Sequence, residues 1–234
     1  MTVLEQVVIL CGGRGTRAWP LTAEVPKPLL EVGGRPVLAH LVDVFAEQGV
    51  TEVVLATGYR GDLVASWAAT VTAAKVRCVD TGEDTGTGER LRRCLGEVDG
   101  TFYATYGDGL GDVDLARLAD RHAQTGRWAT VTSVPLPSQY GTLDLGADDE
   151  VLGFHEKPLL EDHWINAGFF VLEPTLFDAC PGEDLERELL PELAGRGQLG
   201  AYRHRGFWRS MDTQKDVAEL DAIATGGGHP WLRS

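Results

Sequence analysis

Short apolar runs alternate with segments of helical hydrophobic spacing through the first half of the chain. A short apolar run predicts a buried strand, whereas apolar residues that recur every three or four positions predict a helix. The predicted strands are Gln6–Leu10, Glu52–Thr57, Lys75–Asp80 and Phe102–Tyr106, and the predicted helices cover 36–48, 61–69 and 88–95. Such strand–helix–strand repeats imply an α/β fold with a doubly wound, mainly parallel, Rossmann-like sheet flanked by helices.

The second half has a different pattern, in which short strands follow one another between turns. The predicted helices here are 113–125, 183–193 and 213–224, and the predicted strands are 128–134, Thr142–Leu145, 151–156 and 165–172. These strands indicate a mixed, partly antiparallel extension of the same sheet. No repeat or linker interrupts the pattern, which predicts one domain over 1–225 and a tail over 226–234 that is loose around its glycines.

Composition narrows the possible functions. The 234 residues are 43% hydrophobic, enough for one sizeable core, and the formal net charge is −14. An acidic protein repels phosphate backbones, so we expect no nucleic-acid partner, and any phosphorylated ligand must meet a local cluster of cations. Four scattered cysteines predict reduced thiols packed as small hydrophobes. Because no apolar run has the length of a signal segment or a membrane span, we expect a cytoplasmic protein with no membrane partner.

A glycine-rich loop directly follows the first predicted strand and reads Cys11-Gly12-Gly13-Arg14-Gly15-Thr16-Arg17. Ligands of doubly wound sheets bind at the carboxyl ends of the strands, where this loop lies. Its glycines let backbone N–H groups approach a phosphate and form an anion-binding nest. The loop is neither a P-loop nor a dinucleotide fingerprint. On its own, such a turn is more often structural than functional.

Lys27 strengthens the interpretation of that loop. It stands in Val25-Pro26-Lys27-Pro28, where the two prolines restrict the backbone on both sides and so aim the ammonium group. For this segment alone, a solvated surface lysine in a proline turn is the simpler interpretation. The glycine-rich loop just before it favours contact with a phosphate.

The pattern G-G-x-G-T-R followed by P-K-P-L resembles the sugar-1-phosphate nucleotidylyltransferases, and the resemblance continues along nearly the whole chain, most like the glucose-1-phosphate cytidylyltransferase branch. The segments that carry it are Asp80-Thr81-Gly82, Thr87-Gly88-Glu89-Arg90-Leu91-Arg92-Arg93, Thr105-Tyr106-Gly107-Asp108-Gly109, Glu156-Lys157-Pro158, Ile165-Asn166-Ala167-Gly168-Phe169-Phe170 and Gly206-Phe207-Trp208-Arg209-Ser210-Met211-Asp212-Thr213. The resemblance implies a nucleotide-binding half over about 1–110 and a sugar-phosphate-binding half over 111–225, with a small antiparallel sugar-binding extension.

The resemblance also implies roles for individual residues. The expected catalytic residues are Arg17, Lys27, Asp108 and Asp212, of which the two aspartates bind Mg²⁺. The residues expected to bind the nucleotide are Cys11, Gly12, Gly13, Gly15, Thr16, Thr87, Gly88, Arg90 and Gly107. The residues expected to bind the sugar phosphate are Tyr140, Gly141, Glu156, Lys157, Asn166, Gly168 and Trp208.

The aspartate pair is supported by physical chemistry as well. Asp108 follows a strand near the expected sheet centre, between two glycines that leave room for a ligand, and Asp212 precedes a predicted helix. Either residue alone could be a helix cap. Mg²⁺ prefers oxygen ligands and takes one or two carboxylates together with substrate phosphates. A bound cation would also remove the repulsion between two neighbouring carboxylates.

The reaction that the resemblance implies is an in-line displacement. An oxygen of the sugar 1-phosphate attacks the α-phosphorus of an NTP, and pyrophosphate leaves. The nucleophile is already an anion and needs no general base, so catalysis is expected to rest on positioning and charge neutralisation. The resemblance favours CTP and glucose 1-phosphate as the substrates. UTP, GTP or dTTP as the nucleotide, and another hexose or heptose phosphate as the sugar, are the alternatives.

Two other functions have weaker support. A glycosyltransferase with an Asp-x-Asp metal motif could use Asp112-Val113-Asp114, but that segment stands at an expected helix cap and leaves the glycine-rich loop without a role. An inactive regulatory protein that binds nucleotide sugars would be indicated by loss of a catalytic residue. Arg17, Lys27, Asp108 and Asp212 are all present.

Three departures from the cytidylyltransferase branch bear on the substrates and the assembly. The segment between Trp67 and Asp80 lacks the inserted hairpin of that branch, which contributes to subunit contacts near the site. Glu89 replaces a glycine beside the expected base pocket, where it could accept from an exocyclic amine or point to solvent. Cys11 replaces an alanine, which we interpret as packing. We expect a homo-oligomer, with a dimer as the simplest assembly.

Overall fold

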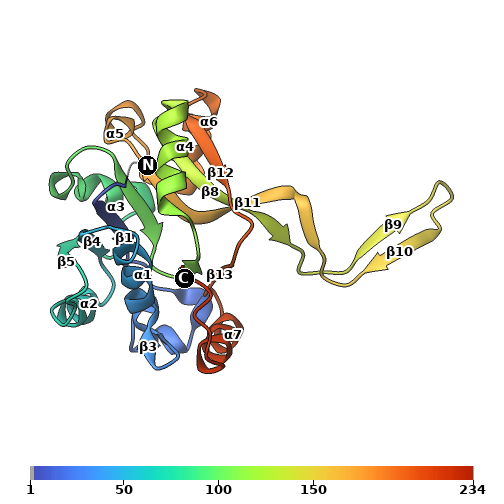
Figure 1. Cartoon of the computed structure of the whole chain (residues 1–234), viewed down its shortest axis with the longest axis horizontal. Coiled ribbons are helices and arrows are strands. Elements are labelled where there is room, and N and C mark those ends of the chain that lie inside the picture. The colour runs from blue at the N-terminus through green and yellow to red at the C-terminus, as the bar shows by residue number, and fades with distance from the viewer. Residues whose placement is uncertain (1–2, 234) are drawn as a thin grey trace.

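The protein, described here over residues 3–233 by a computed structural model, is built on a mixed seven-stranded sheet of order β12-β8-β11-β6-β1-β4-β5 (Figure 1). The strands of this sheet are β1 (Gln6–Leu10), β4 (Glu52–Thr57), β5 (Lys75–Asp80), β6 (Phe102–Tyr106), β8 (Ala129–Pro137), β11 (Leu159–Leu172) and β12 (Leu199–Arg203). Neighbouring strands are parallel except where β11 lies antiparallel between β6 and β8. The expected mainly parallel, doubly wound sheet is confirmed.

Helices cover both faces of the sheet, because successive side chains of its central strands point to opposite sides. Val7 and Ile9 belong to one buried cluster and Val8 to the other. The helices on the first face are α1 (Val37–Ala46), α2 (Gly61–Ala68), α4 (Leu115–Thr125) and α7 (Gln214–Thr225). Those on the second face are α3 (Thr87–Arg93), α5 (Thr175–Ala179) and α6 (Leu190–Gly195), the last preceded by a π-helical turn, Leu185–Leu189.

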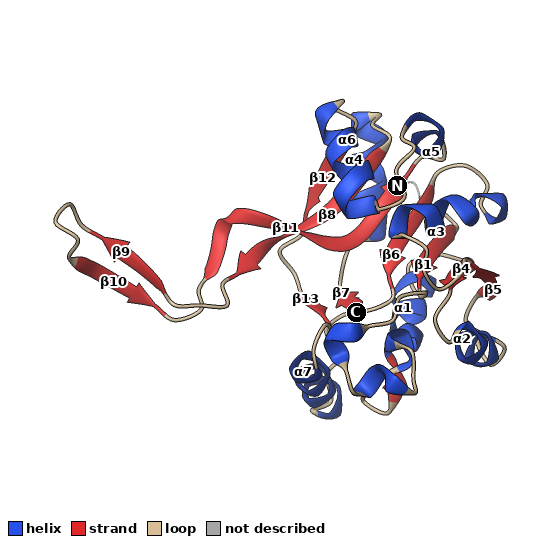
Figure 2. Ribbon diagram, turned by 180° about the vertical axis from the view of Figure 1, so that it is seen from behind, coloured by secondary structure: helices blue, strands red, loops and turns tan. Residues whose placement is uncertain are grey.

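Three small antiparallel ladders complete the fold. They are β2 (Glu31–Val32) with β3 (Arg35–Pro36), β7 (Gly109–Gly111) with β13 (Trp208–Ser210), and β9 (Thr142–Leu145) with β10 (Val151–His155). The β9–β10 ribbon leaves the body as a long projection, which Figures 1 and 2 show from opposite sides. We call residues 138–158 the arm. The expected partly antiparallel extension of the main sheet is confirmed for β8 and β11, whereas β9 and β10 do not belong to it, because they pair only with each other.

The predicted element bounds hold best where the hydrophobic pattern is continuous. All four strands predicted in the first half have the predicted bounds. By contrast, β11 begins at Leu159 rather than 165, because the polar residues Glu161, Asp162 and His163 conceal a strand that continues across a register shift. The helix α5 and the edge strand β12 were not predicted, because each is short and lacks a clear period.

The C-terminal tail is docked where a loose tail was expected. Trp231 is fully buried and packs against the rings of His40 and Phe207, with centroids 5.1 and 5.9 Å apart. A single aromatic after three glycines gives no periodic signal in the sequence. Among the described residues, no helix combines the length and the apolar character needed to cross a membrane.

Candidate active site

A cavity of about 770 Å³ opens at the carboxyl ends of β1 and β6. Its walls contain most of the residues that the sequence placed in a site. Those residues are Cys11, Gly12, Gly13, Gly15, Thr16, Arg17, Lys27, Thr87, Arg90, Gly107, Asp108, Asn166, Gly168, Trp208 and Asp212. The residues predicted to bind the nucleotide and the residues predicted to bind the metal therefore line the same cavity.

The glycine-rich loop is shaped by the lack of side chains at particular positions. Gly15 adopts a left-handed conformation with φ of 60°, which favours glycine. A Cβ at Gly12 would lie 2.1 Å from Arg90, and a Cβ at Gly107 would lie 2.8 Å from the carbonyl oxygen of Leu10. Three glycines thus keep the end of β1 close to its neighbours and leave its backbone open to the cavity.

Lys27 holds the two predicted metal ligands together. It is the first residue of a short 3₁₀ turn, and its side chain is only 10% exposed. Its ammonium lies 2.5 Å from Oδ2 of Asp108 and 2.8 Å from Oδ1 of Asp212. The more exposed Arg17 reaches the same Oδ1 of Asp212 at 2.9 Å. Four charged groups from four segments of the chain thus form one cluster at the cavity wall.

The β7–β13 ladder explains how the two distant aspartates meet. Asp108 immediately precedes β7, and only Met211 lies between the end of β13 and Asp212. Gly109 pairs with Ser210, and the N–H of Met211 donates to the carbonyl of Asp108 at 2.8 Å. Neither aspartate is a helix cap, since no helix follows Asp108 and the cap of α7 is Thr213 in a capping box. Both carboxylates are therefore left to the cavity.

The charge of Asp212 is stabilised by its cationic neighbours. Burial alone disfavours ionisation of this carboxyl, but the hydrogen bond and charge of Lys27, together with Arg17, outweigh it and lower its pKa from the usual 3.8. Asp212 is thus kept as an anion at neutral pH. Among the described residues, no three histidines, cysteines or acidic residues gather as metal ligands. The acceptors offered to a cation here are these two carboxylates, a number that suits Mg²⁺ when phosphates supply further oxygens.

Arg90 lines the cavity but is already bound to the protein. Its guanidinium is buried and donates to the carbonyl oxygens of Gly12, Thr57, Gly82 and Glu83 at 2.7–3.1 Å. These bonds fix the glycine-rich loop against the end of β4 and the turn after β5. Arg90 therefore positions the loop, and its expected part in nucleotide binding stays a prediction.

A chain of hydrogen bonds connects four residues of the cavity wall, Asn166, Tyr106, Glu186 and Thr87. The amide of Asn166 donates to the hydroxyl of Tyr106 at 3.0 Å, and that hydroxyl donates to Glu186. Glu186 also accepts from the hydroxyl of Thr87 at 2.7 Å. Burial, followed by the charge of Glu186, raises the pKa of Tyr106, so the phenol keeps its proton. This network joins Asn166, which was predicted to bind the sugar phosphate, to Thr87, which was predicted to bind the nucleotide.

Glu186 was missed from the sequence. It lies in the π-helical turn Leu185–Leu189, whose extra residue turns one acidic side chain of a charged helix into the cavity. From the sequence, Glu183, Glu186 and Glu188 are indistinguishable members of a solvated face. A π-turn, which is frequent at functional sites, has no sequence signal that periodicity can detect.

Several predicted residues do not line the cavity. Gly88 is buried against the side chain of Leu189 in the packing of α3. Tyr140, Gly141, Glu156 and Lys157 lie on the arm, and their expected contact with sugar phosphate stays a prediction.

Two further acidic residues have partners elsewhere. Glu89 pairs with Arg92 and Arg93 at 2.5 and 2.9 Å, so it faces along its own helix and does not line the cavity. Asp114 caps α4 by accepting from the N–H of Arg117, as expected. It is therefore engaged in helix structure, which removes the support for an Asp-x-Asp metal motif.

Comparison with known proteins finds relatives that match along most of the chain. Residues 6–222 match the family described as Nucleotidyl transferase. The glucose-1-phosphate cytidylyltransferase of Salmonella typhimurium is 35% identical over 97% of this chain and 98% of its own. The probable glucose-1-phosphate cytidylyltransferase of Bacillus subtilis is 36% identical with the same coverage. A mannose-1-phosphate guanyltransferase of Aspergillus oryzae is 33% identical over 90% of this chain and 62% of its own.

Solved structures share the fold at lower identity. HddC from Yersinia pseudotuberculosis superposes with a TM-score of 0.74 at 23% identity, covering 93% of this chain and 98% of its own. A UDP-glucose pyrophosphorylase complexed with UDP-glucose has the same TM-score at 17% identity, covering 96% and 100%. Identities this low support the fold alone, whereas the family match and the relatives above 30% identity extend over nearly the whole chain. The chain therefore belongs to the nucleotidyl transferase family.

Proposed function

We propose that this protein is a sugar-1-phosphate nucleotidylyltransferase that joins CTP to glucose 1-phosphate and releases pyrophosphate. The observation that carries the proposal is the cluster in which Lys27 holds Asp108 and Asp212 beside the glycine-rich loop, in one cavity with Asn166 and Trp208. This arrangement supports a site in which phosphate-binding groups lie between the nucleotide and the sugar. The cytidylyltransferase relatives, which match along nearly their full length, support the choice of substrates.

In the proposed mechanism, the protein positions two anionic substrates and offsets their charge. The phosphate oxygen of the sugar attacks the α-phosphorus, the bond to the bridging oxygen breaks, and pyrophosphate leaves with the electron pair. Arg17 can donate a planar pair of N–H groups to phosphoryl oxygens, and the open backbone of Gly13 can donate beside it. Lys27 sets the position of both carboxylates. These effects are of the kind that dominates phosphoryl transfer.

Asp108 and Asp212 are the residues that would hold Mg²⁺. They are the two carboxylates of the cluster, and each is about one-quarter exposed toward the cavity. The ion would act as a Lewis acid and template for the reacting phosphates. The fit of the donors supports this assignment, since Mg²⁺ typically takes one or two carboxylates from a protein and the rest from phosphates and water.

GTP is the second candidate nucleotide. The guanyltransferase relative is 33% identical, and the cavity wall contains the carboxylates of Glu83 and Asp84, which lie 2.7 and 3.5 Å from the guanidinium of Arg14 and keep oxygens open to a further donor. A carboxylate accepts from an exocyclic amine, which cytosine and guanine have and uracil and thymine lack. This chemistry favours CTP or GTP over UTP or dTTP. Another hexose or heptose phosphate in place of glucose 1-phosphate stays open.

The test is pyrophosphate release in the presence of Mg²⁺. CTP, GTP, UTP and dTTP are each combined with a panel of hexose and heptose 1-phosphates. We expect release that requires both substrates and is fastest with CTP and glucose 1-phosphate. Fastest release with another pair would keep the reaction and correct the substrates. Nucleotide binding without release from any pair, confirmed by equilibrium dialysis, would contradict the enzyme and favour a regulatory protein.

A further inference from the structure

Residues 229–233, which we call the latch, follow the helix α7 and return to the body of the protein. Gly227 has a φ of 90°, a left-handed conformation that favours glycine and lets the chain turn back after the helix. Figures 1 and 2, which view the molecule from opposite sides, both show the end of the chain beside β7 and β13. The latch therefore lies at the ladder that brings Asp108 and Asp212 together.

Trp231 anchors the latch to β13 by packing. Its side chain is fully buried, and its ring centre lies 5.1 Å from that of His40 in α1 and 5.9 Å from that of Phe207, the residue before β13. It belongs to the same buried cluster as Leu110 of β7 and Met211. Within residues 3–233, its indole N–H is buried and donates no hydrogen bond. The shape and the apolar surface of the ring are therefore what hold Trp231 in place.

Arg233 reaches the other strand of the same ladder. Its guanidinium lies 3.2 Å from Oδ2 of Asp114, the N-cap of α4, and donates to the carbonyl of Asp112 at 3.4 Å. Asp112 directly follows β7, and its N–H donates to the carbonyl of Phe207 at 3.2 Å. Trp231 and Arg233 thus contact the residues that flank the two strands at one end of the ladder.

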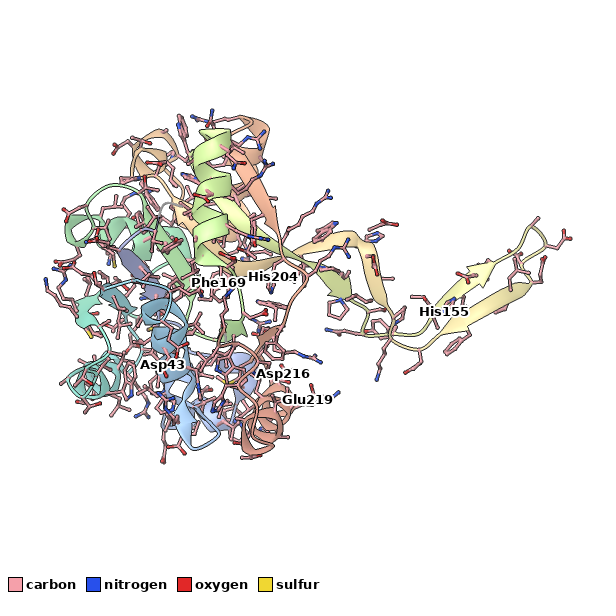
Figure 3. All side chains as sticks on the ribbon, in the orientation of Figure 1. Asp43, His155, Phe169, His204, Asp216 and Glu219 are labelled. Atoms are coloured by element: carbon pink, nitrogen blue, oxygen red, sulfur yellow. The ribbon has the colours of Figure 1, made fainter. Side chains whose placement is uncertain are left out.

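His204 joins the same end of the ladder to the main sheet. It directly follows β12, and Figure 3 labels it together with Asp216 of α7, the two residues that bracket β13 in the chain. Its Nε2 lies 3.0 Å from Oδ1 of Asp112 and 3.1 Å from the carbonyl oxygen of Phe207. This end of the ladder is therefore held by the main sheet as well as by the latch.

The two aspartates lie at the opposite end of the ladder. The ladder has three residue pairs, of which the pair nearest the latch contains Trp208, whereas Asp108 and Asp212 lie beyond the far pair. A two-stranded ribbon is marginally stable by itself, so its position depends on what holds its ends. Trp208 lines the cavity, and its indole N–H donates to the carbonyl of Ala167 at 2.7 Å. A shift of the ladder would therefore move Trp208 and both carboxylates relative to the cavity.

We propose that the latch positions the β7–β13 ladder for the proposed reaction, with Trp231 and Arg233 as the positioning residues. Neither is among the described residues that line the cavity, so each acts through the ladder. The proposal rests on the proposed function, because it extends the same site. The alternative role is stabilisation of the whole protein without any particular effect on the position of the ladder.

Hydrogen exchange and metal binding test the role of the latch without turnover. Trp231→Ala removes the ring that packs on Phe207, and the amide of Met211, which donates to Asp108, should exchange at least about tenfold faster because a loosened ladder opens more often. Mn²⁺, which takes the same oxygen ligands as Mg²⁺, should bind at least about threefold more weakly in the presence of CTP, as measured by electron paramagnetic resonance. Trp231→Phe keeps a ring and loses no hydrogen bond, so it should resemble the wild type in both measurements.

The matched control is Phe177→Ala in α5. It removes a buried ring from the cluster on the opposite face of the main sheet. We expect this substitution to lower the Tm, as Trp231→Ala does, because both remove a large buried side chain. The exchange rate of the Met211 amide and the affinity for Mn²⁺ should stay at their wild-type values.

Turnover gives the second test, with every variant assayed well below the lowest Tm of the set. Trp231→Ala should lower kcat for pyrophosphate release about 10–10²-fold with a smaller change in the KM of the nucleotide, because a misplacement of about 1 Å can cost about 10²-fold in rate. Arg233→Met removes a partly exposed ion pair and should lower kcat only about 2–5-fold.

The proposal would be overturned if Trp231→Ala kept the wild-type exchange rate at Met211, or if Phe177→Ala accelerated that exchange and lowered kcat by as much. Trp231 would then contribute to stability alone. A wild type that releases no pyrophosphate from any substrate pair would instead contradict the proposed function, and the exchange rate at Met211 would still decide whether the latch holds the ladder.

Discussion

The cavity and the arm differ in where their side chains find partners. In the cavity, charged groups meet others from distant parts of the same chain, as Lys27 meets Asp108 and Asp212. On the arm, the exposed apolar side chains of Leu143 and Phe154 lie opposite each other across one ribbon. One folded chain is therefore sufficient to set the geometry of the cavity cluster, whereas it leaves apolar side chains of the arm exposed.

The comparison indicates that substitutions in the cavity should affect catalysis, whereas substitutions of Leu143 or Phe154 on the arm should not. Removing a charge from the cavity leaves its partner partly buried and unbalanced, so effects there should be large and local. Adding a charge to an exposed position of the arm alters no internal contact of the body, so it should leave the fold of the body unchanged. The predictions that follow examine the cavity side of the comparison, from the largest expected effect to the smallest.

The largest effect is expected from loss of an aspartate. Asp108→Ala or Asp212→Ala should lower kcat by at least about 10²–10³-fold, because each removes a carboxylate that would hold Mg²⁺ at the reacting phosphates. The Kd of the nucleotide should change far less. The measurement is pyrophosphate release together with nucleotide titration, with the exposed Asp178→Asn on α5 as control. Equal losses in kcat and in nucleotide affinity would show that the aspartates act in binding.

Arg90→Met should separate positioning from direct binding. It leaves the carbonyls of Gly12, Gly82 and Glu83 without their donor, so we expect a loss of about 3 kcal/mol in the free energy of unfolding. For a chain of this size, that corresponds to a fall in Tm of roughly 6–12 °C. The control is Arg93→Met, which removes a more exposed guanidinium from the same helix. An unchanged Tm with a raised KM for the nucleotide would favour a direct contact between Arg90 and the nucleotide.

The same contrast explains how far the sequence could predict the molecule. The loop and Asp108 were predicted because each directly follows a predicted strand, whereas Lys27 and Asp212 were assigned from the family resemblance. The carbonyl partners of Arg90 and the orientation of Glu186 depend on tertiary packing, which a linear pattern does not contain. The arm was predicted as strands, but not as a separate projection. Alternation along a strand shows which face is apolar, not what covers it.

Glu186→Gln should have an intermediate effect. Glutamine keeps an oxygen for Thr87 or Tyr106 but loses the charge and one acceptor, so the network across the cavity is weakened by about one hydrogen bond. We expect kcat/KM to fall about 5–10-fold with Tm nearly unchanged. Glu183→Gln, in the loop before the same turn, is the matched control. If both substitutions have equal effects, Glu186 is part of a solvated acidic face and has no role in the cavity.

The smallest effect is expected in the pH dependence of stability. Because the folded-state pKa of Asp212 is lowered, its ionised form stabilises the fold above the usual value of 3.8, and this contribution is lost as the pH falls through the folded-state pKa. In urea unfolding at pH 6, 4 and 3, the wild type should therefore lose more stability than Asp212→Asn, by about 1 kcal/mol or less for a partly exposed pair. If the free energy of unfolding depends on pH in the same way for both proteins, Lys27 and Arg17 stabilise this carboxylate no more than water does. The cavity cluster would then be held in place by the packing around it rather than by its own charges.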